Sequence, residues 1–335
     1  MHAGRRFTFK ELFLWSWNDT KWLILLSAIP TLIYIFITRA VAVPWQPVAL
    51  LGTALSFIVG FKNNASYGRL WEARQVYGGI INDSRSFGYT VRDILGGKHS
   101  EIVKTILYRH VAWLTALRFQ LREHRTWENT GIRKNVKYRE HAFKIPEWDS
   151  NLDDELDPFL SVEDKLYVMT KKNKAAQLLA IQSEHFIKLK RETKINDFEW
   201  SKVQDLLHRL TDHQGKAERI KNFPYPRNFA SITTYIVLLF VIILPFGLLR
   251  ELDKWGDGTS YDSILVWLNI PICSIVSWVF YALNEVGESS VNPFEGNAND
   301  IPITQISRTI EIDLRDMLDE TSLPPAISPV NNIVL

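Results

Sequence analysis

The chain has 335 residues, of which 46% are hydrophobic and 23% charged, and its formal net charge is +2. The single cysteine, Cys273, excludes an intrachain disulfide and a cysteine-based metal cluster, and we expect no nucleic-acid partner. The hydrophobic residues are concentrated near residues 22–61 and 229–283, with a charged block between them. This segregation predicts an all-α integral membrane protein with a large soluble insert.

The first 61 residues predict a surface segment followed by two membrane spans. Residues 1–21 combine basic and aromatic side chains in the manner of an amphipathic helix at a membrane surface. Trp22 to Thr38 forms the first apolar run, which reaches about 20 residues, the length of a membrane span, when the flanking residues up to Val43 are included. After a turn marked by Arg39 and Pro44, residues 43–61 form the second span.

The second span carries two parallel stripes of side chains. Residues four apart on an α-helix lie on one drifting ridge, and two such series run along this span. The small residues form a groove that lets another helix approach closely, while the larger residues form the ridge beside it. The groove consists of Gly52, Ser56 and Gly60, and the ridge of Thr53, Phe57 and Phe61. If several copies packed around an axis, the phenylalanines could form stacked rings at the centre of a narrow pore; otherwise they face lipid or a neighbouring helix.

Residues 62–222 predict a cytosolic helical domain. Apolar residues recur at helical spacing in four segments, namely Ile80 to Val91, Glu101 to Leu121, Glu163 to Glu192 and Phe198 to Lys221. The interval from Arg122 to Asp157 is dense in charge and has no sustained period, so we expect loops with short helices there.

Residues 223–284 predict two further spans, Phe229 to Leu249 and Asp262 to Leu283, in which Pro245 and Pro271 should introduce kinks. Lysine and arginine are abundant in the flanks assigned to the inside and sparse in the two intervening loops, which predicts a multi-pass protein with both termini cytoplasmic. Residues 285–335 complete the chain with a cytosolic loop, a helix and a proline-rich strap.

Polar residues follow the second span closely. We expect them to form a buried network that fixes the span to the helical domain, although some of them could contact ions. They are Arg69, Trp71, Glu72, Arg74, Asn82, Asp83 and Arg85. The histidines form no metal-binding motif, and the chain has no phosphate-binding loop, nucleophile elbow or dinucleotide fingerprint. We therefore expect neither an enzyme nor a resident metal.

Two motifs resemble the bestrophin family of ion channels, especially its bacterial members. One is GFKNNASYGRLWEARQVYGGIINDSR after the second span, and the other is VNPFEGNANDIPI after the fourth. The order of spans and insert is also similar to that of the family. The resemblance implies a homopentamer in the bacterial inner membrane, in contact with lipid, with a central pore for small monovalent ions.

The resemblance also implies roles for particular residues. It places the hydrophobic neck of the pore at residues 48–61, with Thr53, Phe57 and Phe61 at its three levels. Family members usually carry bulky apolar residues at all three, so we expect the level of Thr53 to constrict only weakly. It places a second, cytosolic constriction at Phe198, with Ile195 and Trp200 as alternatives in the register.

A calcium clasp is expected to be absent. Eukaryotic bestrophins follow the Asn-Pro-Phe loop with a run of carboxylates that holds calcium, a cation that takes six to eight oxygen ligands. This chain retains only Glu295 and Asp300 there. A weak residual site near Asn292, Glu295 and Asp300, using backbone carbonyls, stays open as an alternative.

The resulting hypothesis is a pentameric channel gated by dewetting of its apolar neck. The positive edges of aromatic rings favour anions such as chloride. A sodium-conducting channel of the same fold is the alternative, and a non-conducting scaffold or a transporter is a further one. A transporter is less favoured because no charged residue occupies the centre of a span.

Overall fold

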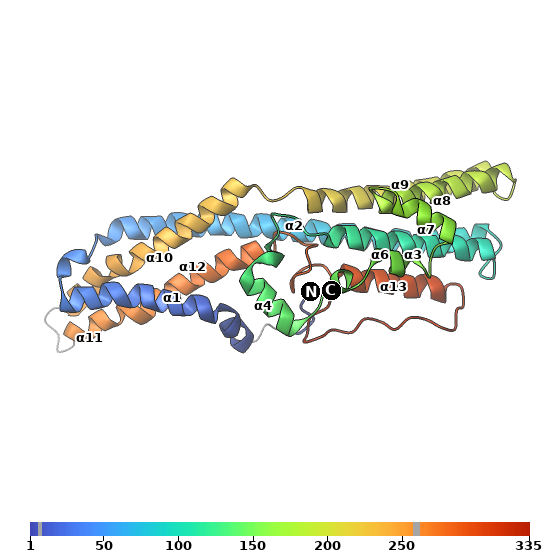
Figure 1. Ribbon diagram of the computed structural model, residues 1–335. Helices are drawn as coiled ribbons and strands as arrows, with labels where there is room; N and C mark the ends of the chain where they lie inside the picture. Colours follow the sequence, from blue (N-terminus) through green and yellow to red (C-terminus); the bar gives the residue numbers. More distant parts are fainter. Residues whose placement is uncertain (6–8, 257–261) are drawn as a thin grey trace. The chain divides into compact units, whose positions relative to one another are not determined.

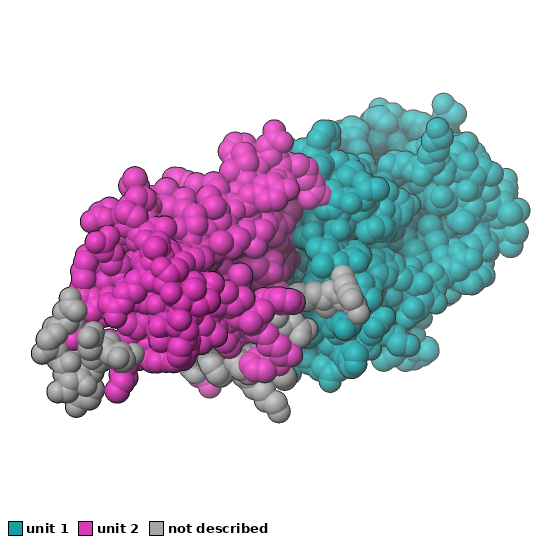
Figure 2. Space-filling view, turned by 60° about the vertical axis from the view of Figure 1, so that its left-hand side comes forward, with its two compact units in different colours: residues 1–4, 69–224, 292–335 teal, residues 5–68, 225–291 magenta. Residues whose placement is uncertain are grey.

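The computed structural model describes residues 1–5, 9–256 and 262–335. These residues form helices joined by turns and loops, with two isolated β-bridges and no β-strand among them. The chain divides into two compact units (Figures 1 and 2). We call residues Arg5–Gly68 and Tyr225–Val291 the membrane unit, and Met1–Gly4, Arg69–Pro224 and Asn292–Leu335 the soluble unit.

The membrane unit contains the four expected membrane-length helical segments. Their apolar windows lie at Asp19–Phe36, in the first part of Trp45–Ile94, in Arg227–Gly256 and in Ile264–Ser289. The corresponding helices are α1 (Phe9–Phe36), the first part of α2 (Trp45–Ile94), α10 (Arg227–Gly256), α11 (Asp262–Trp267) and α12 (Asn269–Ser289). Part of the expected surface segment, residues 6–8, lies outside the described residues.

The core of the membrane unit joins these helices through interlocking aliphatic and aromatic side chains. Leu55 and Val59 of α2 are buried together with Val237 and Phe240 of α10. The fourth span differs from the expectation of a kinked single helix, because a break at Leu268 separates α11 from α12 and places Pro271 in the first turn of α12. Proline is tolerated there because the first-turn N–H groups have no partner within the helix.

Helix α2 is 50 residues long and continues without interruption from the membrane unit into the soluble unit (Figure 1). The segment Ile80–Val91, expected as a separate helix, is its end. No proline follows Pro47 within the helix, so no later residue lacks the backbone N–H that the helix needs. Lys62, the first charged residue after the span, has a partner in Asn284 and is accommodated without a break. It ends shortly before Gly96 and Gly97, which both adopt positive φ angles.

The soluble unit is a helical bundle. The end of α2 packs with α3 (Glu101–Arg122), α8 (Lys174–Arg191), α9 (Asp197–Asn222) and α13 (Ile303–Asp316) around one hydrophobic core. The apolar periodicity of these segments predicted their buried faces correctly. A single stripe of each helix can be buried only when the helices lie side by side, as Figure 1 shows for α8 and α9.

Short helices occupy the charge-rich interval, as expected. They are the 3₁₀ turn η2 (Asn129–Gly131) and the helices α4 (Arg133–Ala142), α5 (Pro146–Asp149) and α6 (Leu152–Leu156). A second 3₁₀ turn, η1 (Arg39–Val41), lies between the first two spans. The prediction of helix over Glu163–Glu192 is wrong in one respect, because the segment forms two helices, α7 (Val162–Met169) and α8, with a break between them. The side chain of Asn173 accepts a hydrogen bond from the backbone N–H of Ala176 at 2.9 Å, and this N-cap starts a new helix.

Candidate ion pathway

The ridge of large residues on α2 faces away from the core of its own chain. Phe57 is 64% exposed and Phe61 73% exposed, whereas Leu55 and Val59 on the opposite face are buried. The Thr53 hydroxyl, also on the exposed face, donates to the carbonyl of Ala49 at 3.0 Å and so has a partner within its own helix. This face of the span is free to line a pore, to contact another copy or to face lipid.

The groove of small residues is used in part within the chain. A Cβ atom on Gly52 would lie 2.9 Å from Cε2 of Phe240, so the glycine permits α2 and α10 to pack closely. Ser56 is exposed and donates to the carbonyl of Gly52 at 2.9 Å, and Gly60 has nothing within 4 Å of its Cβ position. Of the three, only Gly52 serves a close helix contact inside one chain.

A buried lysine, which the sequence did not single out, follows the phenylalanine ridge directly. The Lys62 side chain is 1% exposed, and its ammonium group donates to Asn284 Oδ1 at 2.8 Å and to the Glu288 carboxylate, both on α12. In sequence it is one basic residue at the end of a span, which is common at a membrane interface. Its partners lie more than 200 positions away, so only the fold shows that it fixes the end of the second span to α12.

The polar residues of the soluble part of α2 form separate contacts with different elements. Arg69 donates to the carbonyls of Ile220 and Phe223 at 2.9 and 3.0 Å, and Glu72 pairs with Arg219. The remaining members of the expected network are arranged as follows: Asp83 accepts from Arg209 and is 3.0 Å from His213, Arg85 pairs with Asp313 at 2.7 Å, Arg74 contacts the sulfur of Met1, and Trp71 and Asn82 are exposed. Contacts from Arg69, Glu72 and Asp83 tie α2 to α9, and Arg85 ties it to α13. The expectation of one buried network is wrong, because none of the seven residues is buried and their contacts are separate.

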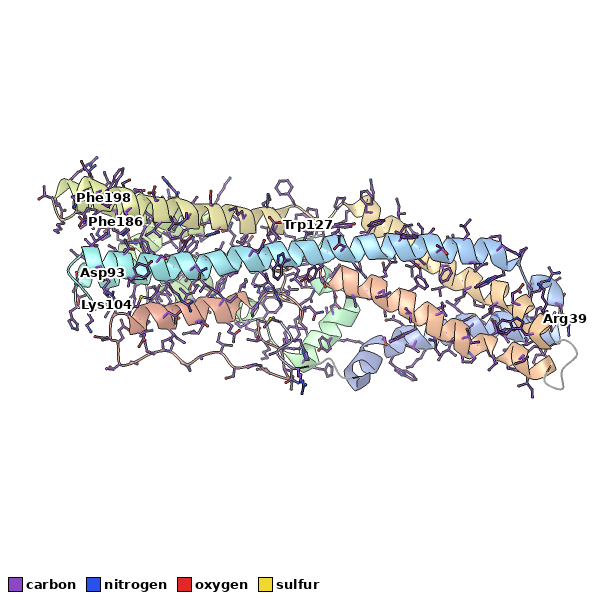
Figure 3. All side chains as sticks on the ribbon, turned by 180° about the vertical axis from the view of Figure 1, so that it is seen from behind. Arg39, Asp93, Lys104, Trp127, Phe186 and Phe198 are labelled. Carbon is purple, nitrogen blue, oxygen red and sulfur yellow. The ribbon has the colours of Figure 1, made fainter. Side chains whose placement is uncertain are left out.

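Phe198 is the exposed member of the three candidates for the cytosolic constriction. It lies in the first turn of α9 and is 78% exposed (Figure 3). Ile195 is buried, and Trp200 is half-buried beneath the Lys190 ammonium, which lies 4.5 Å from its ring centroid. A capping box between Asn196 and Glu199 holds this turn, so the position of Phe198 is well defined.

Comparison with known proteins identifies the family. The model of the bacterial and fungal bestrophin family matches residues 17–316. The chain belongs to this family. The expected resemblance and the all-helical bestrophin fold are therefore confirmed.

Relatives of this bestrophin include named channel proteins. The voltage-dependent anion channel-forming protein YneE of Escherichia coli O157:H7 is 28% identical over 283 residues, 84% of this chain and 80% of that protein. A voltage-dependent anion channel-forming protein of Ralstonia nicotianae is 26% identical over 323 residues, 92% of each chain. The crystal structure of a bacterial bestrophin homologue from Klebsiella pneumoniae matches with a TM-score of 0.75 at 23% identity, covering 91% of this chain and 99% of that chain.

The Asn-Pro-Phe loop of this bestrophin holds its two acidic residues inside the protein. The Asp300 carboxylate accepts from the backbone N–H groups of Gly296 and Asn297 at 2.7 and 2.9 Å, and the Glu295 carboxylate accepts from the N–H of Asn129 at 2.9 Å. Burial raises the pKa of Asp300 to about 6, although Arg122 opposes the shift. Burial, reinforced by the charge of Asp300, raises the pKa of Glu295 well above its usual range.

These contacts leave few oxygen atoms for a cation. Among the described residues, no group of three or more histidine, cysteine, aspartate or glutamate side chains is placed to hold a metal ion. Asn292, the third residue of the expected residual site, donates to Glu295 at 3.2 Å. The two carboxylates therefore serve the folding of the loop itself.

Proposed function

We propose that this bestrophin assembles as a homopentamer in the bacterial inner membrane and conducts small monovalent anions such as chloride. It is a membrane channel protein rather than an enzyme, and its named relatives are described as anion channels. The observation that carries the finer proposal is the exposed phenylalanine ridge of α2. Two large rings at 64% and 73% exposure need a neighbour other than their own chain.

In the proposed assembly, Phe57 and Phe61 of five copies form the neck. A ring of aromatic side chains offers an ion no charge, so the neck conducts only when it is wet and closes when water leaves it. The edge of an aromatic ring carries the positive end of its quadrupole, so rings presented edge-on favour an anion over a cation. Phe198 forms the proposed second constriction, in the soluble unit.

The proposed topology places both termini in the cytoplasm. The distribution of lysine and arginine supports this orientation, since only Arg39, Arg250 and Lys254 belong to the two intervening loops. The second of these loops includes residues 257–261, which lie outside the described residues.

The oligomeric state is the first test. The mass of the purified protein in detergent, corrected for bound detergent by light scattering, should equal five chains. A monomeric species would overturn the proposed pore, because one copy of α2 cannot enclose an ion.

Conduction is the second test, in planar bilayers with the purified protein. The double variant Phe57→Ala with Phe61→Ala should raise the open probability at least tenfold, because the neck becomes wider and wetter. The matched control is Ile275→Ala on α12, an exposed apolar side chain outside the ridge, which should leave the current unchanged. A pentamer that passes no current in either form would favour the non-conducting scaffold.

Selectivity is the third test. In a potassium chloride gradient the reversal potential should move toward the equilibrium potential of chloride. Movement toward the potassium potential, repeated with sodium, would instead support the cation-conducting alternative.

A further inference from the structure

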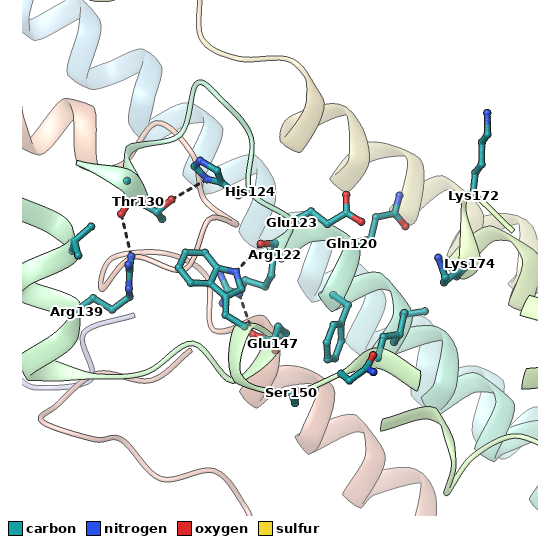
Figure 4. Close-up of a pocket in the computed structure, with 17 residues that line it drawn as sticks. Gln120, Arg122, Glu123, His124, Thr130, Arg139, Glu147, Ser150, Lys172 and Lys174 are labelled. Atoms are coloured by element: carbon teal, nitrogen blue, oxygen red, sulfur yellow. Dashed lines mark hydrogen bonds and ion pairs between the residues drawn. The ribbon is translucent and has the colours of Figure 1, made fainter. Parts of the chain in front are cut away.

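The soluble unit contains a cavity of about 750 Å³ that the proposed channel function does not use (Figure 4). It lies among the end of α3, helix α4, the α5–α6 segment and the start of α8. Its volume is in the range of about 300–1,000 Å³ that is typical of small-molecule sites. All of its lining residues belong to the soluble unit.

The lining is basic. Arg139, Lys172 and Lys174 contribute positive charge at two ends of the cavity, Arg139 at one and the lysines at the other (Figure 4). Within the described part of the chain neither lysine ammonium has an ion pair or a hydrogen bond. The two carboxylates of the lining are already paired, Glu123 with Arg125 at 3.0 Å and Glu147 with Arg118.

An aromatic face is also open to the cavity. Trp148 is 40% exposed, and its indole N–H donates to the carbonyl of Arg122 at 2.9 Å, which fixes the orientation of the ring. The guanidinium of Arg139 lies 4.8 Å from the ring centroid. A fixed aromatic ring beside a cation is suited to stacking with a planar, electron-rich group.

A third feature is the buried guanidinium of Arg122, another lining residue. Its side chain is fully buried, and its Nη1 donates to the carbonyl of Phe294 at 3.0 Å. Its Nε and Nη2 have no hydrogen-bond partner, and Nε lies 3.6 Å from the Glu147 carboxylate. Because this side chain is fully buried, its positive charge lies behind the lining, where it adds to the basic character of the cavity without contacting solvent.

We propose that this cavity binds an organic anion that carries a planar ring. The phosphate or carboxylate of the ligand pairs with Lys172 and Lys174, and the ring stacks on Trp148 near Arg139. Lysine ammonium groups bind such oxyanions as flexible point charges, and the lysines and the tryptophan line one cavity whose volume exceeds that of an inorganic ion. Binding here does not depend on conduction through the neck.

The test is isothermal titration calorimetry with the full chain in detergent. The probes are adenosine 5′-monophosphate, 2-naphthoate, adenosine and inorganic phosphate, which separate the ring from the charge and phosphate from carboxylate. We expect at least one of the two ring-bearing anions to bind at least tenfold more tightly than both adenosine and inorganic phosphate. Raising the salt concentration should weaken this binding, because salt screens the attraction between the solvent-accessible lysine ammonium groups and the anion.

Variants locate the site. The double variant Lys172→Gln with Lys174→Gln should weaken binding of the ring-bearing anion at least tenfold, and Trp148→Leu should do the same while leaving the salt dependence in place. The matched control is Lys202→Gln with Lys216→Gln, which removes the same charge from exposed positions of α9 outside the cavity.

Three results would overturn the proposal. They are the absence of binding by both ring-bearing anions, equal binding by inorganic phosphate alone, and full affinity in the lysine double variant. Since Lys172 and Lys174 have no partner in the described fold, their loss should not unfold the protein, and an unchanged melting temperature of the double variant establishes this.

Discussion

At the scale of single residues, His110 is a neutral imidazole in the core of the soluble unit. It is fully buried, its Nε2 lies 2.9 Å from the Ser84 hydroxyl, and its ring stacks on Phe87 and contacts the tilted ring of Trp113. Burial lowers its pKa from 6.5 to about 3. Below pH 6.5 the imidazole is therefore protonated in the unfolded chain but stays neutral in the folded chain. The free energy of unfolding falls as the pH falls from 6.5 toward 3.

His110→Gln should remove this acid sensitivity while keeping a hydrogen bond to Ser84. Between pH 6.5 and 4.5, the wild type should lose stability relative to the variant with a slope that approaches about 1 kcal/mol per pH unit. Melting curves of the purified protein over a pH series measure the difference. His208→Gln on the exposed face of α9 is the control, and parallel pH profiles for wild type and His110→Gln would contradict the prediction.

Lys62 ties the end of the second span to α12 through two polar contacts. Lys62→Met keeps the aliphatic stem but removes the bonds to Asn284 and Glu288, so it should lower the free energy of unfolding by about 1–3 kcal/mol. The control is Lys254→Met, whose pair with Glu251 is largely exposed at 2.9 Å and should contribute no more than about 1 kcal/mol. Thermal melting in detergent compares the two, and an equal loss in both would contradict a special role for Lys62.

At the scale of elements, the packing of α2 against α9 depends on where the glycines of α2 lie. Gly78 and Gly79 are adjacent but meet different surroundings. A Cβ atom on Gly79 would lie 2.3 Å from the ring of His213 on α9, whereas one on Gly78 has nothing within 4 Å. Gly78 is therefore not needed for any close contact in the described fold, whereas Gly79 leaves room for the His213 ring of α9.

The two glycines should respond oppositely to alanine. Gly79→Ala should destabilise the protein by about 1–3 kcal/mol, because the ring of His213 must move and leave Asp83. Gly78→Ala should be neutral or stabilise by up to about 1 kcal/mol, because alanine favours the helix. Melting temperatures of the paired variants give the answer, and a similar loss in both would show that α9 does not pack here.

At the scale of the whole molecule, the proposed channel should conduct without calcium. Glu295 and Asp300 are buried, and each carboxylate already accepts hydrogen bonds from nearby N–H groups, although Asp300 Oδ1 has no partner in the described fold. Burial raises the pKa of both carboxyl groups, which disfavours the charged form that a cation would bind. Calcium needs about six to eight oxygen ligands, which this loop does not present. We infer that no calcium switch operates here.

Bilayer currents recorded in chelator and in about millimolar calcium, the range of weak extracellular sites, should therefore be equal. Asp300→Asn is the companion variant, since an amide oxygen can still accept the two backbone N–H groups. A calcium-dependent current that disappears in Asp300→Asn would contradict the inference and support the weak residual site.

Much of the fold follows from local sequence. Apolar runs of membrane length and helical periodicity predicted the four spans and the buried faces of the bundle, because a helix is set by interactions between residues close in the chain. The break at Asn173 was missed, since a capping side chain overrode a periodicity that continues past it. The same locality explains why the phenylalanine ridge of α2 could be recognised from spacing alone.

The sequence by itself therefore determined which segments are helices, which of them have membrane length, and that Thr53, Phe57 and Phe61 share a face. Only the tertiary structure decided what each face meets. Gly52 meets Phe240, Lys62 meets Glu288, and Arg122 joins α3 to the loop at Phe294. Such contacts join residues far apart in the chain, and no local pattern specifies them because they depend on how the helices pack.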